Sequence, residues 1–195
     1  DSCTTLSLSL SSAEVASSKI RTGGFFKKTC YNNTIMVYCD FSMSFRKEIV
    51  EMYDALTVAE YVIKYSTLSG MPVSNLRLQK VLYFIQAEFM VSTNSECFND
   101  RIEAWDLGPV VPTVYRKYKV FGASSIPIDS SKDAERIINS KDRKMMNETI
   151  NHCNKYSTST LVEITHNQDP WIKARNSCFS KVISPESLYE YFKEE

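Results

Sequence analysis

The apolar residues of the chain follow a helical period over most of its length after Met43. The first stripe, at steps of three and four, is formed by Ala55, Val58, Val62 and Tyr65. A second helix is predicted from Ser74 or Asn75, either of which is a good N-cap, and its apolar residues cover most of its circumference. We therefore expect this second helix to be central. Its polar residues Lys80 and Gln86 are expected to bond to the backbone of the GPVVP segment that follows.

Two prolines brace the GPVVP segment, which lies within IEAWDLGPVVPTVY. Proline disfavours helical geometry in the residue before it, so Pro109 is expected to hold Gly108 extended. Pro112 is expected to do the same for Val111. The segment is then stiff before anything binds to it. Pro112 also suits the first turn of a helix, which is expected to stop at Gly122.

The rest of the chain predicts one short strand and several further helices. Residues 101–105 alternate between the two sides of a strand. A later apolar stripe, on a helix of about four turns, is formed by Met145, Met146, Thr149, Ile150, Cys153 and Tyr156. Ser157 and Ser184 are expected N-caps of two further helices, and Pro170 is expected to begin a turn between them. The predicted fold class is mainly α: a compact helical domain of about six or seven helices with a short β element near residues 101–105, preceded by an irregular N-terminal tail.

Residues 1–42 lack this patterning and predict a separate segment. The opening stretch is rich in Ser and Thr, and it has neither a basic start nor a continuous apolar run, so it does not resemble a signal peptide. The expected organisation is a tail over residues 1–42, disordered or non-native, followed by a helical domain over residues 43–195. An accessory N-terminal hairpin is the alternative.

Charge and composition narrow the classes of function. The 195 residues include 23 basic and 23 acidic side chains, so no net field attracts the chain to nucleic acid or to an anionic membrane. No apolar run approaches the length of a membrane span. Aromatic residues make up 12% of the chain, which supplies adhesive surface as well as core. These features favour a protein-binding role.

The cysteines and histidines predict neither a disulfide framework nor a metal site. The six cysteines are scattered without a CxxC pair; they are Cys3, Cys30, Cys39, Cys97, Cys153 and Cys178. We interpret them as reduced thiols of a cytoplasmic protein. Apart from the adjacent His152 and Cys153, no histidine stands at ligand spacing from a cysteine, so we expect no zinc and no cofactor. His166 could be imagined as a general base, but no evident nucleophile is near it in sequence, and a packed or capping histidine is the better interpretation.

Three blocks of the sequence resemble a known family. The blocks NLRLQKVLYFIQAEF, IEAWDLGPVVPTVYRKYKVFG and LVEITHNQDPW contain the elements LQK, W-x-x-GPV-x-P-x-VY and TH-x-x-x-PW. In this order they resemble the Panacea domain family, also described as SocA-like or GepA-type phage-associated proteins, over roughly residues 54–195. Each element alone is a weak signal, and the three together are specific.

This resemblance implies a mostly α-helical antitoxin that neutralises the toxin of a bacterial or prophage toxin-antitoxin pair by direct protein contact. One branch of the family resembles a proteolytic adaptor, which makes a protease or chaperone a second partner to consider. The positions that the resemblance marks as characteristic, and as candidate partner-binding residues, are Asn75, Leu76, Leu78, Gln79, Lys80, Tyr83, Gln86, Glu103, Trp105, Gly108, Pro109, Val110, Pro112, Tyr115, His166 and Trp171.

Two other classes of function stay open beside a toxin-binding protein. The first is a DNA-binding autorepressor that uses the C-terminal helices, although residues 43–195 have nearly equal numbers of basic and acidic residues and no evident basic recognition helix. The second is an enzyme, such as a hydrolase centred on His166. The segment from Trp105 to Tyr115 has two interpretations. It is a turn that packs the tryptophan into the core, or it is a surface that contacts a partner directly, and both can hold.

Overall fold

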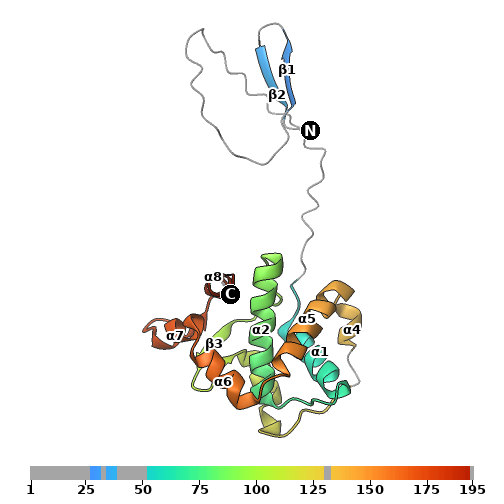
Figure 1. Cartoon of the computed structure of the whole chain (residues 1–195), viewed down its shortest axis with the longest axis vertical. Coiled ribbons are helices and arrows are strands. Elements are labelled where there is room, and N and C mark those ends of the chain that lie inside the picture. Colours follow the sequence, from blue (N-terminus) through green and yellow to red (C-terminus); the bar gives the residue numbers. More distant parts are fainter. Residues whose placement is uncertain (1–26, 32–33, 39–51, 130–132, 194–195) are drawn as a thin grey trace. The chain divides into compact units, whose positions relative to one another are not determined.

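The computed structural model describes residues 27–31, 34–38, 52–129 and 133–193 (Figure 1). The chain divides into two units, Asp1–Ile49 and Val50–Glu195. In the first unit, strand β1 (Lys27–Tyr31) pairs antiparallel with strand β2 (Thr34–Tyr38). This pairing is the hairpin that the sequence left as an alternative. The boundary predicted between residues 42 and 43 lies outside the described residues and stays a prediction, as does the predicted disorder of the remaining residues of the tail.

Helices α1 (Ala55–Leu68) and α2 (Asn75–Thr93) both begin at side-chain caps. Asp54 Oδ2 accepts a hydrogen bond from the backbone N–H of Thr57 at 3.3 Å. Ser74 Oγ accepts one from the backbone N–H of Arg77 at 3.4 Å. Such caps satisfy N–H groups that have no partner in the first turn of a helix. Of the two caps predicted for α2, Ser74 is therefore the one used.

Helix α2 is the centre of the second unit, as its sequence predicts. Besides α1 it contacts five further elements: β4 (Gly108–Val110), α3 (Pro112–Tyr118), α5 (Ser140–Cys153), α6 (Thr158–His166) and α8 (Pro185–Phe192). Figure 1 shows α2 in the middle of this unit, with α1 and α5 on one side and α6 on the other. Its largest buried apolar side chains include Tyr83, Leu78, Leu82, Ile85 and Phe89. Each such burial stabilises the fold by about 1.5 to 3 kcal/mol.

A small antiparallel sheet packs beside α2. The central strand is β3 (Ile102–Trp105), with β4 on one edge and β5 (Val182–Ile183) on the other. Ile102 and Ala104 are buried, while Glu103 and Trp105 on the opposite face are partly exposed. The predicted strand is confirmed. Strands β4 and β5 were not predicted, because three and two residues are too few to show a period.

The remaining helical elements are the 3₁₀ helix η1 (Lys119–Phe121), α4 (Ala134–Ile137) and α7 (Asp169–Asn176). The described residues hold eight α-helices, so the mainly α fold class is confirmed. The sequence missed α4, because four residues complete barely one turn. The predicted caps Ser157 and Ser184 are both used. Within the described ranges, no helix is long and apolar enough to span a membrane.

Candidate functional site

A buried lysine on α2 holds the GPVVP segment from within. Lys80 is fully buried, and its ammonium group donates a hydrogen bond to the backbone carbonyl of Pro109 at 2.9 Å. Burial penalises the charged form of an amine, so the pKa of Lys80 falls from 10.5 to about 7. The prediction that Lys80 bonds to this segment is confirmed.

Two neutral side chains of α2 complete this attachment. Gln79 Oε1 accepts a hydrogen bond from the backbone N–H of Val111 at 2.9 Å. Gln79 Nε2 donates to Asn75 Oδ1 at 3.0 Å, and Asn75 Nδ2 donates to the carbonyl of Tyr115 at 3.3 Å. Asn75 and Gln79 are four residues apart, so they share one face of the helix. That face fixes both the GPVVP segment and the first turn of α3.

Glycine is required where β3 turns into β4. Gly108 has a φ of +97°, a conformation that L side chains rarely adopt. A Cβ atom added there would lie 2.8 Å from Lys80 Nζ and 2.8 Å from Thr165 Oγ1. The prediction that Gly108 is held in an ordinary extended conformation is therefore wrong, because the tight turn demands a positive φ. Val111, with φ −92° and ψ 103°, is extended as predicted.

Gln86 braces a different loop from the predicted one. Its Oε1 accepts hydrogen bonds from the backbone N–H groups of Cys97 and Phe98 at 3.1 and 3.2 Å. Its Nε2 donates to the carbonyl of Phe98 at 3.0 Å. Gln86 is about 1.7 turns along α2 from Lys80, so the two side chains leave the helix in different directions. Gln79 provides the second brace that the sequence assigned to Gln86.

An aromatic pair stands at the outer surface of the braced segment. The rings of Trp105 and Tyr115 lie edge to face, with centroids 4.9 Å apart and an interplanar angle of 65°. The indole Nε1 of Trp105 donates to Glu103 Oε2 at 2.9 Å. Both rings are partly exposed, and the indole lies outside the core. The ring of Trp105 is therefore accessible to a partner and is not docked in the interior.

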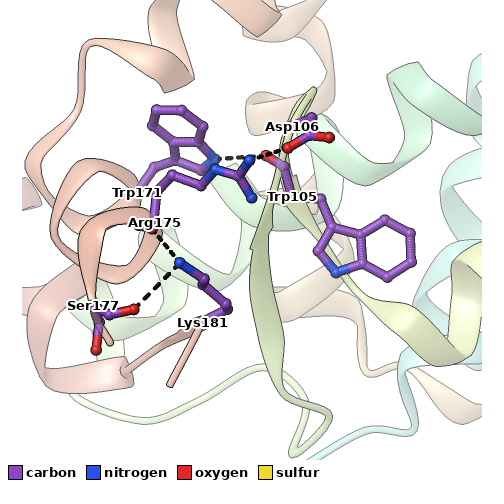
Figure 2. Close-up of polar contacts among 6 residues, drawn as sticks. All are labelled: Trp105, Asp106, Trp171, Arg175, Ser177 and Lys181. Carbon is purple, nitrogen blue, oxygen red and sulfur yellow. Dashed lines mark hydrogen bonds and ion pairs between the residues drawn. The ribbon is translucent and has the colours of Figure 1, made fainter. Parts of the chain in front are cut away.

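Trp171 of α7 supports β3 from the opposite side, as Figure 2 shows. Its indole Nε1 donates to the backbone carbonyl of Trp105 at 3.1 Å. The ring of His166 stacks on Trp171, with centroids 4.2 Å apart. Burial and the nearby charge of Lys80 lower the pKa of His166 from 6.5, although a backbone hydrogen bond with Asp106 raises it. The imidazole is therefore neutral at pH 7 and packs as an aromatic ring.

Charged side chains border the aromatic pair. Arg175 of α7 forms an ion pair with Asp106, and Arg101 forms one with Glu103 at 2.8 Å. The ammonium of Lys181 donates to two backbone carbonyls, one of them that of Arg175 (Figure 2). Arg175 and Lys181 thus lie on the side of β3 on which Trp171 packs, away from the ring of Trp105.

These elements enclose a groove of about 700 Å³, here named the tryptophan groove. It is lined by Asn75, Leu76, Gln79, Glu103, Ala104, Trp105, Asp106, Leu107, Val110, Tyr115, Lys119, Gly122, Ala123, Arg175 and Lys181. A separate cavity of about 550 Å³ lies between α2, α5, α6 and α8, and none of the characteristic residues lines it. The tryptophan groove is therefore the candidate site.

The structure divides the sequence-predicted site residues into groups. Those that line the groove are Asn75, Leu76, Gln79, Glu103, Trp105, Val110 and Tyr115. Those that support it from below or behind are Lys80, Gly108, Pro109, Pro112, His166 and Trp171. Tyr83 and Gln86 lie elsewhere on α2: the ring of Tyr83 packs against Phe84 and Phe192, and Gln86 holds the loop at residues 96–98.

Sequence reasoning missed the cations of the groove. Arg175 follows Trp171 by four residues, so a helical wheel of α7 places the two together and could have indicated it. Lys119 follows Tyr115 at the same spacing. Lys181 reaches the groove only because β5 pairs with β3 across a long sequence separation, and no local pattern reveals that.

Comparison with known proteins shows that a family model matches the part of the chain that contains the aromatic pair. Residues 78–172 match the family model described as "Antitoxin SocA-like, Panacea domain". The resemblance to the Panacea domain family is confirmed. The matched residues run from α2 to α7, so the Panacea match covers the aromatic pair and the lysine beneath it. Asn75, Leu76, Arg175 and Lys181 also line the groove and lie outside the match.

A curated relative supports the Panacea match. The protein named Antitoxin SocA, from Caulobacter vibrioides (strain NA1000 / CB15N), is 40% identical over 73 residues. This alignment covers 37% of the present chain and 39% of that protein, so the chain spans about two fifths of the length of this relative. No solved structure matches the chain significantly.

Proposed function

We propose that the chain is an antitoxin-type interaction protein, which neutralises the toxin of a bacterial or prophage toxin-antitoxin pair by direct binding. The contact surface in this proposal is the tryptophan groove. The observation that carries it is the partly exposed pair of Trp105 and Tyr115, which is fixed to α2 through buried side chains. The Panacea match and the similarity to a protein named Antitoxin SocA supply the toxin as the class of partner.

Rigidity is the physical basis of this choice. Lys80, Gln79 and Asn75 bond to the backbone between residues 109 and 115, so the groove is ordered before a partner arrives. Binding to an ordered surface costs little conformational entropy. Tryptophan and tyrosine are also enriched among the residues that dominate binding energy in protein interfaces. A prearranged aromatic surface of this kind suits the capture of another polypeptide.

The same features favour a role without catalysis. The ring of His166 is stacked against Trp171, and its pKa is lowered. Lys80, the amine with the most perturbed pKa among the described lysines, is fully buried and bonded to a carbonyl. Lys80 therefore supports the groove from the interior, and His166 packs behind it against Trp171. A proteolytic adaptor and a DNA-binding autorepressor remain the alternative roles for the same surface.

Co-expression with the product of the adjacent gene tests the proposal. The neighbour should arrest growth when it is produced alone, and production of this chain should restore growth. Trp105→Ala should weaken the rescue, whereas Leu68→Ala, at a residue 71% exposed on α1, should leave it intact. A neighbour that is harmless alone, or that stays toxic beside the wild-type chain, would refute the proposal.

A further inference from the structure

The acidic groups of the tryptophan groove are already neutralised by cations of the same chain. Glu103 pairs with Arg101, and it also accepts a hydrogen bond from the indole of Trp105. Asp106 pairs with Arg175. Neither carboxylate is therefore available to balance a further cation at this surface without breaking a contact that the fold already makes.

Among the described residues, no carboxylate pairs with Lys119 or Lys181, the two lysines of the groove. For the side chain of Lys119 the structure gives no ion pair or hydrogen bond within the described residues. The ammonium of Lys181 donates to two backbone carbonyls, which are neutral acceptors. Because each carboxylate of the groove is paired with an arginine, Lys119 and Lys181 leave the groove with an excess of positive charge. The chain as a whole has a net charge of zero. Such a local field selects an anionic group on whatever binds there.

The two lysines line the groove from different elements. Lys119 follows Tyr115 by one helical turn at the end of α3. Lys181 lies next to β3, because its carbonyl accepts a hydrogen bond from the backbone N–H of Ala104 at 2.8 Å. The side chain of Lys181 leaves the sheet on the face of Ala104, toward α7, whereas the indole of Trp105 lies on the opposite face (Figure 2). An incoming chain that covers the indole therefore meets Lys119 one turn beyond Tyr115, whereas Lys181 adds its charge from the other face of β3.

The floor between the cations is apolar. Leu76 and Val110 line it together with the two aromatic rings. Leu107, at the tip of the hairpin between β3 and β4, is 57% exposed and extends this surface. An occupant must therefore offer an apolar group as well as an anion, since either alone leaves half of the surface uncovered.

We infer that the tryptophan groove binds an acidic segment of the partner polypeptide, in which a carboxylate faces Lys119 and an adjacent apolar side chain covers Trp105 and Tyr115, while Lys181 adds positive charge from the other face of β3. The inference rests on the proposed function and specifies the chemistry of the toxin surface. Single-stranded nucleic acid also combines negative charge with planar rings. A polypeptide is the favoured ligand, because the chain has no net basic charge. The groove also has two unbalanced cations and not the row of basic residues that follows a nucleic-acid backbone.

Charge reversal tests the inference with the purified product of the adjacent gene as the probe. Lys119→Glu should weaken binding by about tenfold, and raising the salt concentration should weaken wild-type binding more than it weakens binding of the variant. Lys181→Met removes the second charge and should also weaken binding. Lys155→Glu is the matched control, since Lys155 is exposed at the end of α5 and lies outside the groove. Thermal melting of each variant separates loss of binding from loss of fold.

Peptides of defined composition give a second test that does not need the toxin. A fluorescent peptide that alternates aspartate with leucine should bind the full chain and compete with the gene product. The matched peptide with lysine in place of aspartate should not bind. An oligothymidylate of similar length should not compete; if it displaces the gene product from the groove, the groove is a nucleic-acid site and the inference is wrong.

The outcomes separate this inference from the proposed function. If Trp105→Ala weakens binding and Lys119→Glu and Lys181→Met do not, the groove binds the toxin through apolar contact alone, and only the inference fails. If the gene product does not bind the wild-type chain, the proposed function fails and the inference falls with it. Loss of binding in the two lysine variants, with Lys155→Glu unchanged, supports both.

Discussion

The buried amine of Lys80 predicts an unusual dependence of stability on pH. In the folded chain the pKa of Lys80 is about 7, whereas the ordinary value of 10.5 applies when the chain is unfolded. Below pH 7 both states bind the proton, and stability does not depend on this group. Between the two values the unfolded state binds more protons, so the free energy of unfolding rises with pH, by about 1.4 kcal/mol per unit at most.

The size of the effect follows from these two pKa values. Between about pH 6.5 and pH 8.5 the folded amine loses most of its proton and the unfolded amine keeps it, which adds about 2 kcal/mol of stability. Two other groups have shifted pKa values in the fold: His166, whose pKa is lowered, and the buried thiol of Cys153, whose pKa is raised from 9.0 to about 12. A variant that lacks only the amine keeps both groups, so the difference between the two proteins reports Lys80 together with its charge coupling to His166.

Urea unfolding of the wild type and of Lys80→Met over this pH range measures the difference. Methionine preserves much of the volume of the lysine stem and cannot be protonated. We expect the wild type to gain about 2 kcal/mol relative to the variant as the pH rises across this interval. A difference that stays constant within about 0.5 kcal/mol would show that the amine keeps its charge in the fold, and the account of a desolvated lysine beneath β4 would be wrong.

Three further changes test the supports of the groove by urea unfolding. Gly108→Ala should destabilise the fold by about 2 to 4 kcal/mol, because it adds a contact with Lys80 to an unfavourable φ, whereas Gly70→Ala, with φ +75° and no atom within 4 Å of an added Cβ, should cost about 1 kcal/mol. Trp171→Phe should cost about 1 to 2 kcal/mol, since it removes the bond from the indole to β3; no loss would contradict that contact. Gln86→Leu should cost about 2 to 4 kcal/mol, because it leaves two buried backbone N–H groups without an acceptor, and a neutral result would refute that brace.

The helices could be predicted from the sequence because each has its own periodicity and cap. The apolar circumference of α2 predicted its central place, and Ser74 predicted where it begins. Alternation at Ile102 and Ala104 predicted β3. The edge strands could not be found this way: β4 has three residues and β5 has two, and both depend on pairing with β3.

The candidate site was predicted in part, because its residues come from both local and distant segments. The braced GPVVP segment and the Trp105 to Tyr115 pair lie together in sequence, and their motif was recognisable. The partner of each buried polar group was harder to assign. Gln79 and Gln86 are both glutamines on one helix, and only the three-dimensional rotation of α2 decides which one faces Val111.

The affinity of the purified chain for the product of the adjacent gene, compared between the wild type and Trp105→Ala, tests the central claim most directly. Because the indole is partly exposed, the substitution should cost only about 1 to 2 kcal/mol of unfolding free energy, mainly through its contact with Tyr115. It should weaken binding by about thirtyfold, as expected for an anchoring tryptophan, while Leu68→Ala binds like the wild type. Equal affinity for Trp105→Ala and the wild type would show that the chain does not grip its partner through the tryptophan groove.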